Sequence, residues 1–268
     1  MADDAERAEL RRRVYGTGDL AALPVFAGGF INFGYWRDVD LTGGLTVDQR
    51  VATQEALYDV VLDALPARAG DRVLEVGSGH GLGALRVVRR EPALVRGVDV
   101  VPEQVARAAE GVDDPRVAFV RGAAHDLPFP DSSFDAVLSV EAAQHFEDVA
   151  GFARESARVL VPGGRFALTT FLARDADAGP RLAALLRTFA TGLDLAHPVD
   201  AVLDHLRAAG FAGVTARAIG EHVWRGLDRW LELGPEPDRW DRNFLRAADQ
   251  GLLDYYLVTA RKPAGSVA

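Results

Sequence analysis

Three glycines at alternate positions, Gly77, Gly79 and Gly81, follow strand-like residues in the stretch VLEVGSGHG at 73–81. Glycine adopts backbone angles that other residues avoid, and it leaves no Cβ between the backbone and a ligand. A glycine turn between a strand and a helix therefore lets a nucleotide-like ligand lie against bare backbone. Glu75, just before the turn, offers a carboxylate to a cationic or hydroxyl-bearing group. The motif predicts a bound cofactor.

The residues around this motif indicate an adenosine-like ligand. Asp99 ends the next expected strand, where a carboxylate can accept hydrogen bonds from both ribose hydroxyls. The glycine spacing departs from the dinucleotide fingerprint GxGxxG. His80 is the only basic residue between Gly77 and Leu85, so phosphate charge would be poorly compensated. The sequence contains no GKS or GKT, which argues against a P-loop.

Further blocks follow the glycine motif in a fixed order. They are GVDVVPEQV (97–105), FVRGAAHDLPFPDSSFDAVLSVEAAQHF (119–146) and RVLVPGGRFAL (158–168). With these blocks the chain resembles class I S-adenosylmethionine-dependent methyltransferases over roughly residues 50–262. The resemblance implies an α/β fold: a Rossmann-like, seven-stranded, mostly parallel sheet with helices on both faces, an antiparallel last strand and helical lid elements. It also implies S-adenosyl-L-methionine (SAM) as cofactor and S-adenosyl-L-homocysteine as product.

The resemblance also implies cofactor contacts along the ends of the strands. Glu75 would lie near the methionine amino group, Asp99 would hold the ribose diol, and Val100 would pack on adenine. The family usually carries an acidic residue where this chain has Ala123, so adenine recognition would depend on the backbone of Ala124 or on Asp126. The full expected set is Gln54, Glu75, Gly77, Gly79, Gly81, Asp99, Val100, Gln104, Ala123, Ala124 and Val140.

Methyl transfer from a sulfonium is an in-line displacement that needs aligned reactants and a dry site. A nucleophile that carries a proton also needs a base within hydrogen-bonding reach. His145, just beyond the fourth expected strand, faces the crevice where α/β folds bind ligands, and histidine titrates near neutrality. Glu141 is the competing base, and His222 in GEHVWRG is the third candidate. The alternatives are that His145 packs against the following helix and that Glu141 contacts the cofactor ammonium or the loop backbone.

The stretch FINFGYW at 30–36 resembles the lid of small-molecule methyltransferases that act on natural products and sugars. Aromatic faces attract a sulfonium cation and stack on a planar acceptor. The expected acceptor contacts are Phe33, Tyr35, Trp36 and Trp224. For Phe33, a hydrophobic plug on the sheet edge is the alternative.

The elements that must position these residues follow from the sequence pattern. Thr46 is the expected N-cap of a helix that ends near Leu65, with Gln49 as its capping partner. Strands then alternate with helices, which indicates a parallel sheet covered on both faces. Strands are expected at 71–77, 94–99, 116–120, 134–140, 165–172, from 214 and at 252–262. Helices are expected at 3–14, 80–90, 102–110, 148–160, 179–191, 198–209, 225–233 and 238–249, with a turn at Pro162-Gly163-Gly164.

Length and composition favour one domain over residues 1–268. We expect an N-terminal lid at 1–45 and substrate-covering insertions at about 173–200 and 222–250. The chain has no cysteine, which removes disulfides, thiolate zinc sites and a cysteine nucleophile; no metal is expected. A net charge of −9 argues against nucleic-acid binding. The sequence shows no apolar membrane span or signal core, so we expect a cytoplasmic protein.

These features predict a SAM-dependent methyltransferase (EC 2.1.1) that acts on a small apolar or aromatic acceptor in bacterial secondary metabolism. Transfer to oxygen is the first expectation because a histidine base suits a hydroxyl; nitrogen and ring carbon stay open. The alternatives are a SAM-fold protein with a non-methylating reaction such as cyclisation, or a nicotinamide oxidoreductase. No membrane or nucleic-acid partner is expected, and a homodimer is left open.

Overall fold

The protein is described by a computed structural model over residues 4–18, 20, 23, 25–66, 68–236 and 240–265. Its described part contains a seven-stranded sheet in the order β3-β2-β1-β4-β5-β7-β6. β7 runs antiparallel to β5 and β6, and the other neighbours pair in parallel. The predicted fold class is therefore confirmed. The strands are β1 (Arg72–Val76), β2 (Leu94–Asp99), β3 (Val117–Arg121), β4 (Phe134–Val140), β5 (Leu160–Ala173), β6 (Ala212–Ala218) and β7 (Leu253–Arg261).

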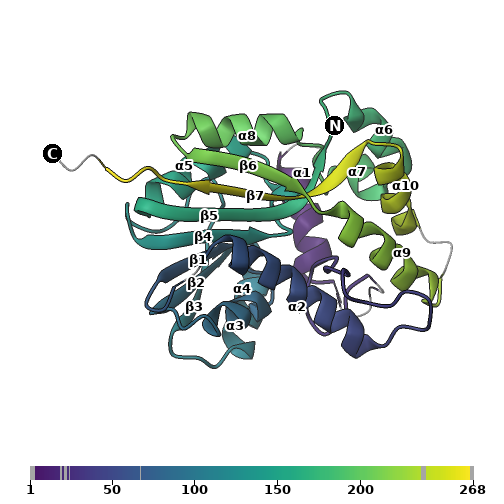
Figure 1. Ribbon diagram of the computed structural model, residues 1–268, viewed down its shortest axis with the longest axis horizontal. Helices are drawn as coiled ribbons and strands as arrows, with labels where there is room; N and C mark the ends of the chain where they lie inside the picture. The colour runs from purple at the N-terminus through teal and green to yellow at the C-terminus, as the bar shows by residue number, and fades with distance from the viewer. Residues whose placement is uncertain are drawn as a thin grey trace.

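Helices cover both faces of the sheet (Figure 1). On one face, α2 (Val47–Ala64) and α3 (Leu82–Val88) pack on inward-facing strand residues such as Val73. On the other, α5 (Val149–Val159) and α8 (Val199–Ala208) pack on residues such as Leu74. Adjacent strand residues point to opposite faces, so the apolar run of β1 feeds two separate cores.

The predicted start of α2 is confirmed. The backbone N–H of Gln49 donates to Thr46 Oγ1 at 3.2 Å, and the Gln49 side-chain oxygen accepts from the Thr46 N–H at 2.9 Å. This capping box satisfies two backbone donors that the first helical turn leaves without partners.

Several helices gather beyond the carboxyl end of the parallel strands, to the right in Figure 1. They are α6 (Ala178–Leu185), α7 (Arg187–Thr191), α9 (Trp224–Glu232) and α10 (Asn243–Asp249). The single helix predicted at 179–191 is wrong, because Leu186 is extended (φ −121°, ψ 119°) and separates α6 from α7. Leu186 is fully buried in the core with Leu182, and that packing overrides the local helical pattern.

Two other boundaries differ from the sequence expectations. Pro162-Gly163-Gly164 lies inside β5 as an irregularity, since pairing with β4 passes from Leu160 directly to Arg165. The first two residues of the helix expected at 238–249 lie outside the described residues. Its described part is a 3₁₀ turn at Trp240–Arg242 followed by α10.

The N-terminal strap, defined here as residues 4–18, crosses the carboxyl end of the sheet. It comprises α1 (Asp4–Arg11) and a π-helical turn, η1 (Arg12–Gly16); Asp3, where the expected helix begins, lies outside the described residues. Arg11 forms an ion pair with Glu147, and Arg12 pairs with Glu103 on α4 (Pro102–Gly111). The strap is thus attached to elements that follow two different strands.

The aromatic lid, defined here as residues 25–36, is held by buried polar side chains of α2. The Arg50 guanidinium donates to the carbonyls of Val25 (2.8 Å) and Asn32 (2.7 Å). The Gln54 amide donates to the carbonyls of Phe30 (3.0 Å) and Asn32 (3.1 Å). Gln54 therefore anchors the lid backbone, whereas the sequence had suggested a cofactor contact.

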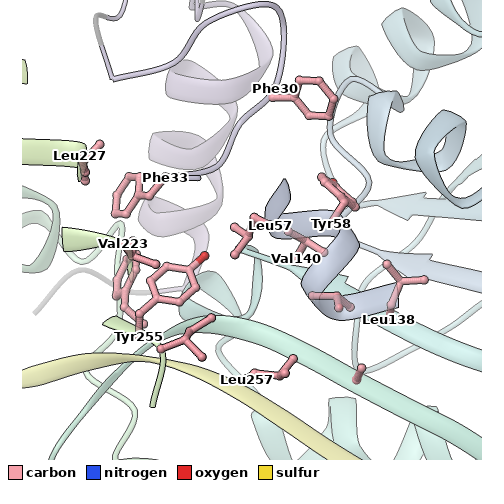
Figure 2. Close-up of a cluster of buried hydrophobic side chains, with 14 of the residues drawn as sticks. Phe30, Phe33, Leu57, Tyr58, Leu138, Val140, Val223, Leu227, Tyr255 and Leu257 are labelled. Atoms are coloured by element: carbon pink, nitrogen blue, oxygen red, sulfur yellow. The ribbon is translucent and has the colours of Figure 1, made fainter. Parts of the chain in front are cut away.

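Phe33 of the aromatic lid enters the hydrophobic core beside Val223 and Leu227, while Phe30 lies near Tyr58 (Figure 2). Next to this core, Trp36 lies directly against Gly226 of α9: a Cβ at Gly226 would come within 2.0 Å of Trp36 Cγ. The aromatic lid thus closes on α9 because one position there has no side chain.

Gly226→Ala is expected to push Trp36 from this contact and to destabilise the fold by about 1–3 kcal/mol, the usual cost of overpacking. Urea denaturation followed by tryptophan fluorescence would measure the change in the free energy of unfolding. Gly43→Ala is the matched control, because an added Cβ there meets no atom within 4 Å. Equal stability of the two variants would contradict the described lid packing.

Candidate active site

A cavity opens at the carboxyl ends of β1, β2 and β4, between the N-terminal strap and the aromatic lid. Its wall combines the glycine turn, the segment after β2, the turn after β4 and residues of both covering segments. The lining residues include Arg11, Tyr15, Phe30, Ile31, Gly77, Ser78, Gly79, His80, Asp99, Val100, Gln104, Ala123, Ala124, Val140, Glu141, His145 and Phe146. Ligands bind at this edge in open α/β sheets.

The glycine turn after β1 forms a bare backbone cradle. Gly77, Gly79 and Gly81 have φ values of 82°, 50° and 78°, a region that side chains rarely allow. A Cβ at Gly77 would come within 2.2 Å of the Ala142 Cβ. The glycines are therefore required both by the turn and by its close approach to the β4 turn.

Asp99 closes the other side of the cradle. Its carboxylate accepts hydrogen bonds from the Gly79 N–H (3.0 Å) and the Val101 N–H (2.9 Å), which fixes it at the end of β2. A carboxylate has about four acceptor sites, so capacity for two hydroxyls remains. Val100 beside it is 39 % exposed and lines the cavity.

Glu75 and Gln104 support the cavity more than they form its open surface. Glu75 is completely buried behind the glycine turn, where it accepts a hydrogen bond from Tyr58 Oη (2.9 Å). Burial raises the pKa of Glu75 to about 8. The Gln104 amide donates to the Tyr15 carbonyl (2.8 Å), so Gln104 holds the N-terminal strap.

Polar atoms without a hydrogen-bond partner lie in and behind the cavity wall. Among the described residues, Ser78 Oγ, His80 Nε2 and Gln104 Oε1 belong to lining residues, and Glu75 Oε2 lies behind the glycine turn; all four atoms are buried and lack a partner. Buried polar groups without partners are costly. The bare cradle, the Asp99 carboxylate and these orphaned atoms fit a ligand with hydroxyl, ammonium and carboxylate groups, as SAM has.

His145 lies at the end of the 3₁₀ turn Ala143–His145 and lines the cavity. Its Nδ1 lies 2.8 Å from the Leu193 carbonyl and 3.2 Å from Asp194 Oδ1. A carbonyl accepts only, so Nδ1 carries the proton and Nε2 carries the lone pair. Burial lowers the pKa of His145 to about 4, and the imidazole is neutral at physiological pH.

Glu141 takes a structural position at the start of the same turn. Its Oε2 accepts hydrogen bonds from the Phe33 N–H (2.8 Å) and Tyr255 Oη (2.6 Å). Burial raises the pKa of Glu141 to about 8, although both hydrogen bonds act in the opposite direction. Glu141 also lines the cavity.

The remaining predicted residues lie apart from this cavity wall. His222 packs edge-on against Tyr35 (5.1 Å between ring centroids) and lies 3.5 Å from Glu221. Phe33 and Trp224 belong to a buried aromatic cluster with Phe171, Phe244 and Tyr255. The aromatic lid contributes Phe30 and Ile31 to the cavity instead.

Two residues of the site were missed by the sequence reasoning. Tyr15, in the N-terminal strap, places its hydroxyl 3.0 Å from His145 Nε2. Asp194, in the segment after α7, is buried beside Nδ1, and burial raises its pKa to about 7. Neither residue stands in a recognisable motif, and both are distant from His145 in sequence.

Comparison with known proteins identifies the family. Residues 74–168 match a family described as a methyltransferase domain. The chain is 33 % identical to the 27-O-demethylrifamycin SV methyltransferase of Amycolatopsis mediterranei, over 87 % of this chain and 90 % of that protein. The chain belongs to this methyltransferase family. It is also 31 % identical to the erythromycin 3''-O-methyltransferase of Saccharopolyspora erythraea, over 88 % and 84 % of the two chains.

Solved structures agree on the fold. The structure of the [4+2]-cyclase SpnF matches 97 % of this methyltransferase chain and 97 % of the SpnF chain, with a TM-score of 0.75 and 26 % sequence identity. Geranyl diphosphate C-methyltransferase from Streptomyces coelicolor, solved with S-adenosyl-L-homocysteine, matches 98 % and 100 % with a TM-score of 0.81 and 16 % identity. Together with the cradle, family membership makes SAM the cofactor of this methyltransferase.

None of the helices in the described part of the chain is long and apolar enough to cross a membrane. Nor do the described residues bring together three or more His, Cys, Asp or Glu side chains in a way that could hold a metal ion.

Asp99→Asn tests the expected ribose contact. Replacing the carboxylate removes a charged acceptor, and such hydrogen bonds contribute about 1.5–3 kcal/mol, or roughly 10- to 100-fold in affinity. Calorimetric titration with S-adenosylhomocysteine would measure the loss. Asp113→Asn, an exposed residue in the loop after α4, is the control. Unchanged affinity in Asp99→Asn would refute the ribose role.

The pKa of His145 also predicts a pH dependence of stability. The unfolded histidine titrates near 6.5 and the folded one near 4, so the unfolded chain binds more protons in this window. Stability from this group is complete above about pH 6.5 and falls as the pH approaches 4, by up to about 3 kcal/mol. Urea denaturation across this pH range measures the free energy of unfolding. Its slope against pH should be smaller for His145→Gln than for wild type, with His205→Gln as control. An identical slope in wild type and His145→Gln would be inconsistent with a buried neutral imidazole.

Proposed function

We propose that this methyltransferase transfers the SAM methyl group to a hydroxyl of a small secondary metabolite, with His145 as the base. One observation carries the proposal: Nε2 of His145 is the basic nitrogen and lies at the cavity, because Nδ1 is committed to the Leu193 carbonyl. The two relatives described above support oxygen as the acceptor atom, since their names place the acceptor on natural-product oxygens.

We assign the cofactor contacts to the cavity wall. Asp99 accepts the ribose hydroxyls, Val100 with Ala123 and Ala124 flanks adenine, and Gly77 and Gly79 contact the methionine part through their backbone. His80 Nδ1 lies 3.0 Å from the Gly29 carbonyl and carries the proton, so Nε2 of the neutral ring, which has no protein partner among the described residues, suits a donor such as the methionine ammonium. When bound, SAM supplies an electrophilic methyl group on a sulfonium.

His145 then has a defined task. As an acceptor hydroxyl forms its new bond to carbon, the oxygen becomes strongly acidic, and Nε2 takes its proton. A low imidazole pKa does not prevent this step, because a protonated ether is far more acidic than an imidazolium. Asp194, 3.2 Å from Nδ1, lies where a carboxylate stabilises the imidazolium that forms.

Glu141 and His222 suit supporting roles better. Glu141 Oε2 is already occupied by Phe33 and Tyr255, so this carboxyl anchors the aromatic lid and the sheet around the base. His222 packs on Tyr35 and interacts with the lid rather than with the cavity wall. His145 is therefore the base of choice among the three candidates.

The acceptor is expected to be apolar or aromatic and to reach the cavity between the N-terminal strap and the insertions at 173–200 and 222–250. Phe30, Ile31 and Phe146 provide apolar wall at the cavity. Phe33, Tyr35, Trp36 and Trp224 would then shape the pocket from behind through their packing. The cytoplasmic location stays a prediction from the sequence, and a homodimer stays open.

A second candidate function is a SAM-fold cyclisation without methyl transfer. The observation that favours it is the likeness to the [4+2]-cyclase SpnF, which spans 97 % of this chain. Product mass separates the two reactions, because a cyclisation leaves the mass unchanged whereas a methylation adds one CH₂.

The test is an acceptor screen of hydroxylated polyketides, glycosides and phenols with SAM, read by mass spectrometry. We expect a product with one added CH₂. His145→Gln should lower turnover by about 10²- to 10⁴-fold, the usual contribution of a general base, with S-adenosylhomocysteine affinity retained. Full activity in His145→Gln would remove it as the base. A product of unchanged mass would favour cyclisation.

Asp194→Asn provides the matched second variant. It keeps the shape beside Nδ1 and removes the charge, so kcat should fall by about 10-fold or more while acceptor KM and cofactor affinity stay close to wild type. A change confined to KM would instead assign Asp194 to acceptor binding.

A further inference from the structure

The base nitrogen of His145 already has a partner in the absence of an acceptor. Tyr15 Oη lies 3.0 Å from Nε2, and the Gln144 amide nitrogen lies 3.2 Å from it. Burial raises the pKa of Tyr15 well above its ordinary value, so the hydroxyl keeps its proton and donates. The single lone pair of a neutral imidazole accepts one strong hydrogen bond. An acceptor hydroxyl must compete for that lone pair.

Tyr15 is held in place through its backbone. The amide of Gln104 and the guanidinium of Arg107 both donate to the Tyr15 carbonyl, at 2.8 and 3.1 Å. Arg107 also donates to the Gly16 carbonyl at 2.5 Å. On the other side, the Arg11 guanidinium donates to the His145 carbonyl at 2.9 Å. The N-terminal strap thus bridges α4 and the His145 turn, with the Tyr15 hydroxyl between them.

We propose that Tyr15 masks the catalytic base: its hydroxyl occupies Nε2 of His145 until an acceptor hydroxyl displaces it, which keeps water from using the base. This inference rests on the proposed role of His145. The reaction that masking suppresses is methyl transfer to water. In that reaction an O–C bond forms to water as the C–S bond breaks, Nε2 takes the proton, and the products are methanol and S-adenosylhomocysteine.

The contact pattern favours a mask over a proton relay. A relay would require Tyr15 to give up its proton readily, and its surroundings disfavour the phenolate. The strap is attached mainly by polar contacts at its edges, including the ion pairs of Arg11 with Glu147 and Arg12 with Glu103. The Arg12–Glu103 pair is partly exposed and contributes little to the free energy of folding, so it opposes movement of the segment only weakly.

The first test uses the free protein and needs no methyl transfer. A donor on Nε2 stabilises the neutral imidazole, so Tyr15→Phe should raise the pKa of His145 toward 6.5 and shift its Nε2 resonance in ¹⁵N-histidine NMR. Tyr35→Phe is the matched control, because Tyr35 contacts a different histidine, His222. An unchanged His145 titration in Tyr15→Phe would overturn the contact and the proposal.

The second test measures methanol and S-adenosylhomocysteine formed from SAM and water without acceptor. Tyr15→Phe should increase this reaction by about 3- to 10-fold, the effect of one lost hydrogen bond, and the double variant with His145→Gln should abolish the increase. Arg107 is exposed, and Arg107→Met removes hydrogen bonds to the strap without changing the Tyr15 ring. This variant should also increase methanol formation. A tenfold fall in acceptor methylation by Tyr15→Phe, with no added methanol, would identify a relay and refute the mask.

The two tests separate this proposal from the proposed function. If His145 is not the base, the NMR titration still reports the Tyr15 contact, while methanol formation is independent of His145→Gln. If His145 is the base and Tyr15 is no mask, His145→Gln remains inactive while Tyr15→Phe forms no more methanol than wild type.

Discussion

The turn at Glu141 is the constraint on which the rest of the site depends. Glu141 has φ = 49°, a left-handed conformation that costs a side-chain-bearing residue about 1–2 kcal/mol. Donors from the aromatic lid and from β7 meet on its Oε2. They hold the residue in that conformation, and the chain leaves β4 sharply enough for the next turn to carry His145 to the cavity.

The same turn joins segments that are far apart in sequence. Gln144 receives a hydrogen bond from Thr170 Oγ1 on β5 (2.6 Å) and accepts one at its carbonyl from the Leu195 N–H (2.8 Å). Leu193 and Asp194 then fix the ring of His145 from one side, and Tyr15 meets it from the other. The imidazole of His145 is therefore held jointly by the β4 turn, the segment after α7 and the N-terminal strap, so a shift in any of them moves the ring.

Local patterns predicted the parts of this protein that local chemistry determines. The glycine turn, Asp99 and the capping box at Thr46 follow from backbone geometry and short-range hydrogen bonds, and they stand as expected. The split of α6 from α7 at Leu186 depends on core packing that periodicity does not contain. Asp194, Tyr15 and the lid-anchoring role of Gln54 arise from contacts between distant segments. The aromatic residues of FINFGYW predicted a lid, but composition alone does not tell which residues of the stretch line the cavity; in the structure these are Phe30 and Ile31.

The most direct measurement is a crystal structure of the complex with S-adenosylhomocysteine and an acceptor found in the screen. With His145 as the base and Tyr15 as its mask, we expect the acceptor hydroxyl oxygen within hydrogen-bonding distance of His145 Nε2, with the Tyr15 hydroxyl moved away and Nδ1 still on the Leu193 carbonyl. An acceptor that places another atom toward the cofactor sulfur, while Tyr15 keeps its contact with Nε2, would contradict it.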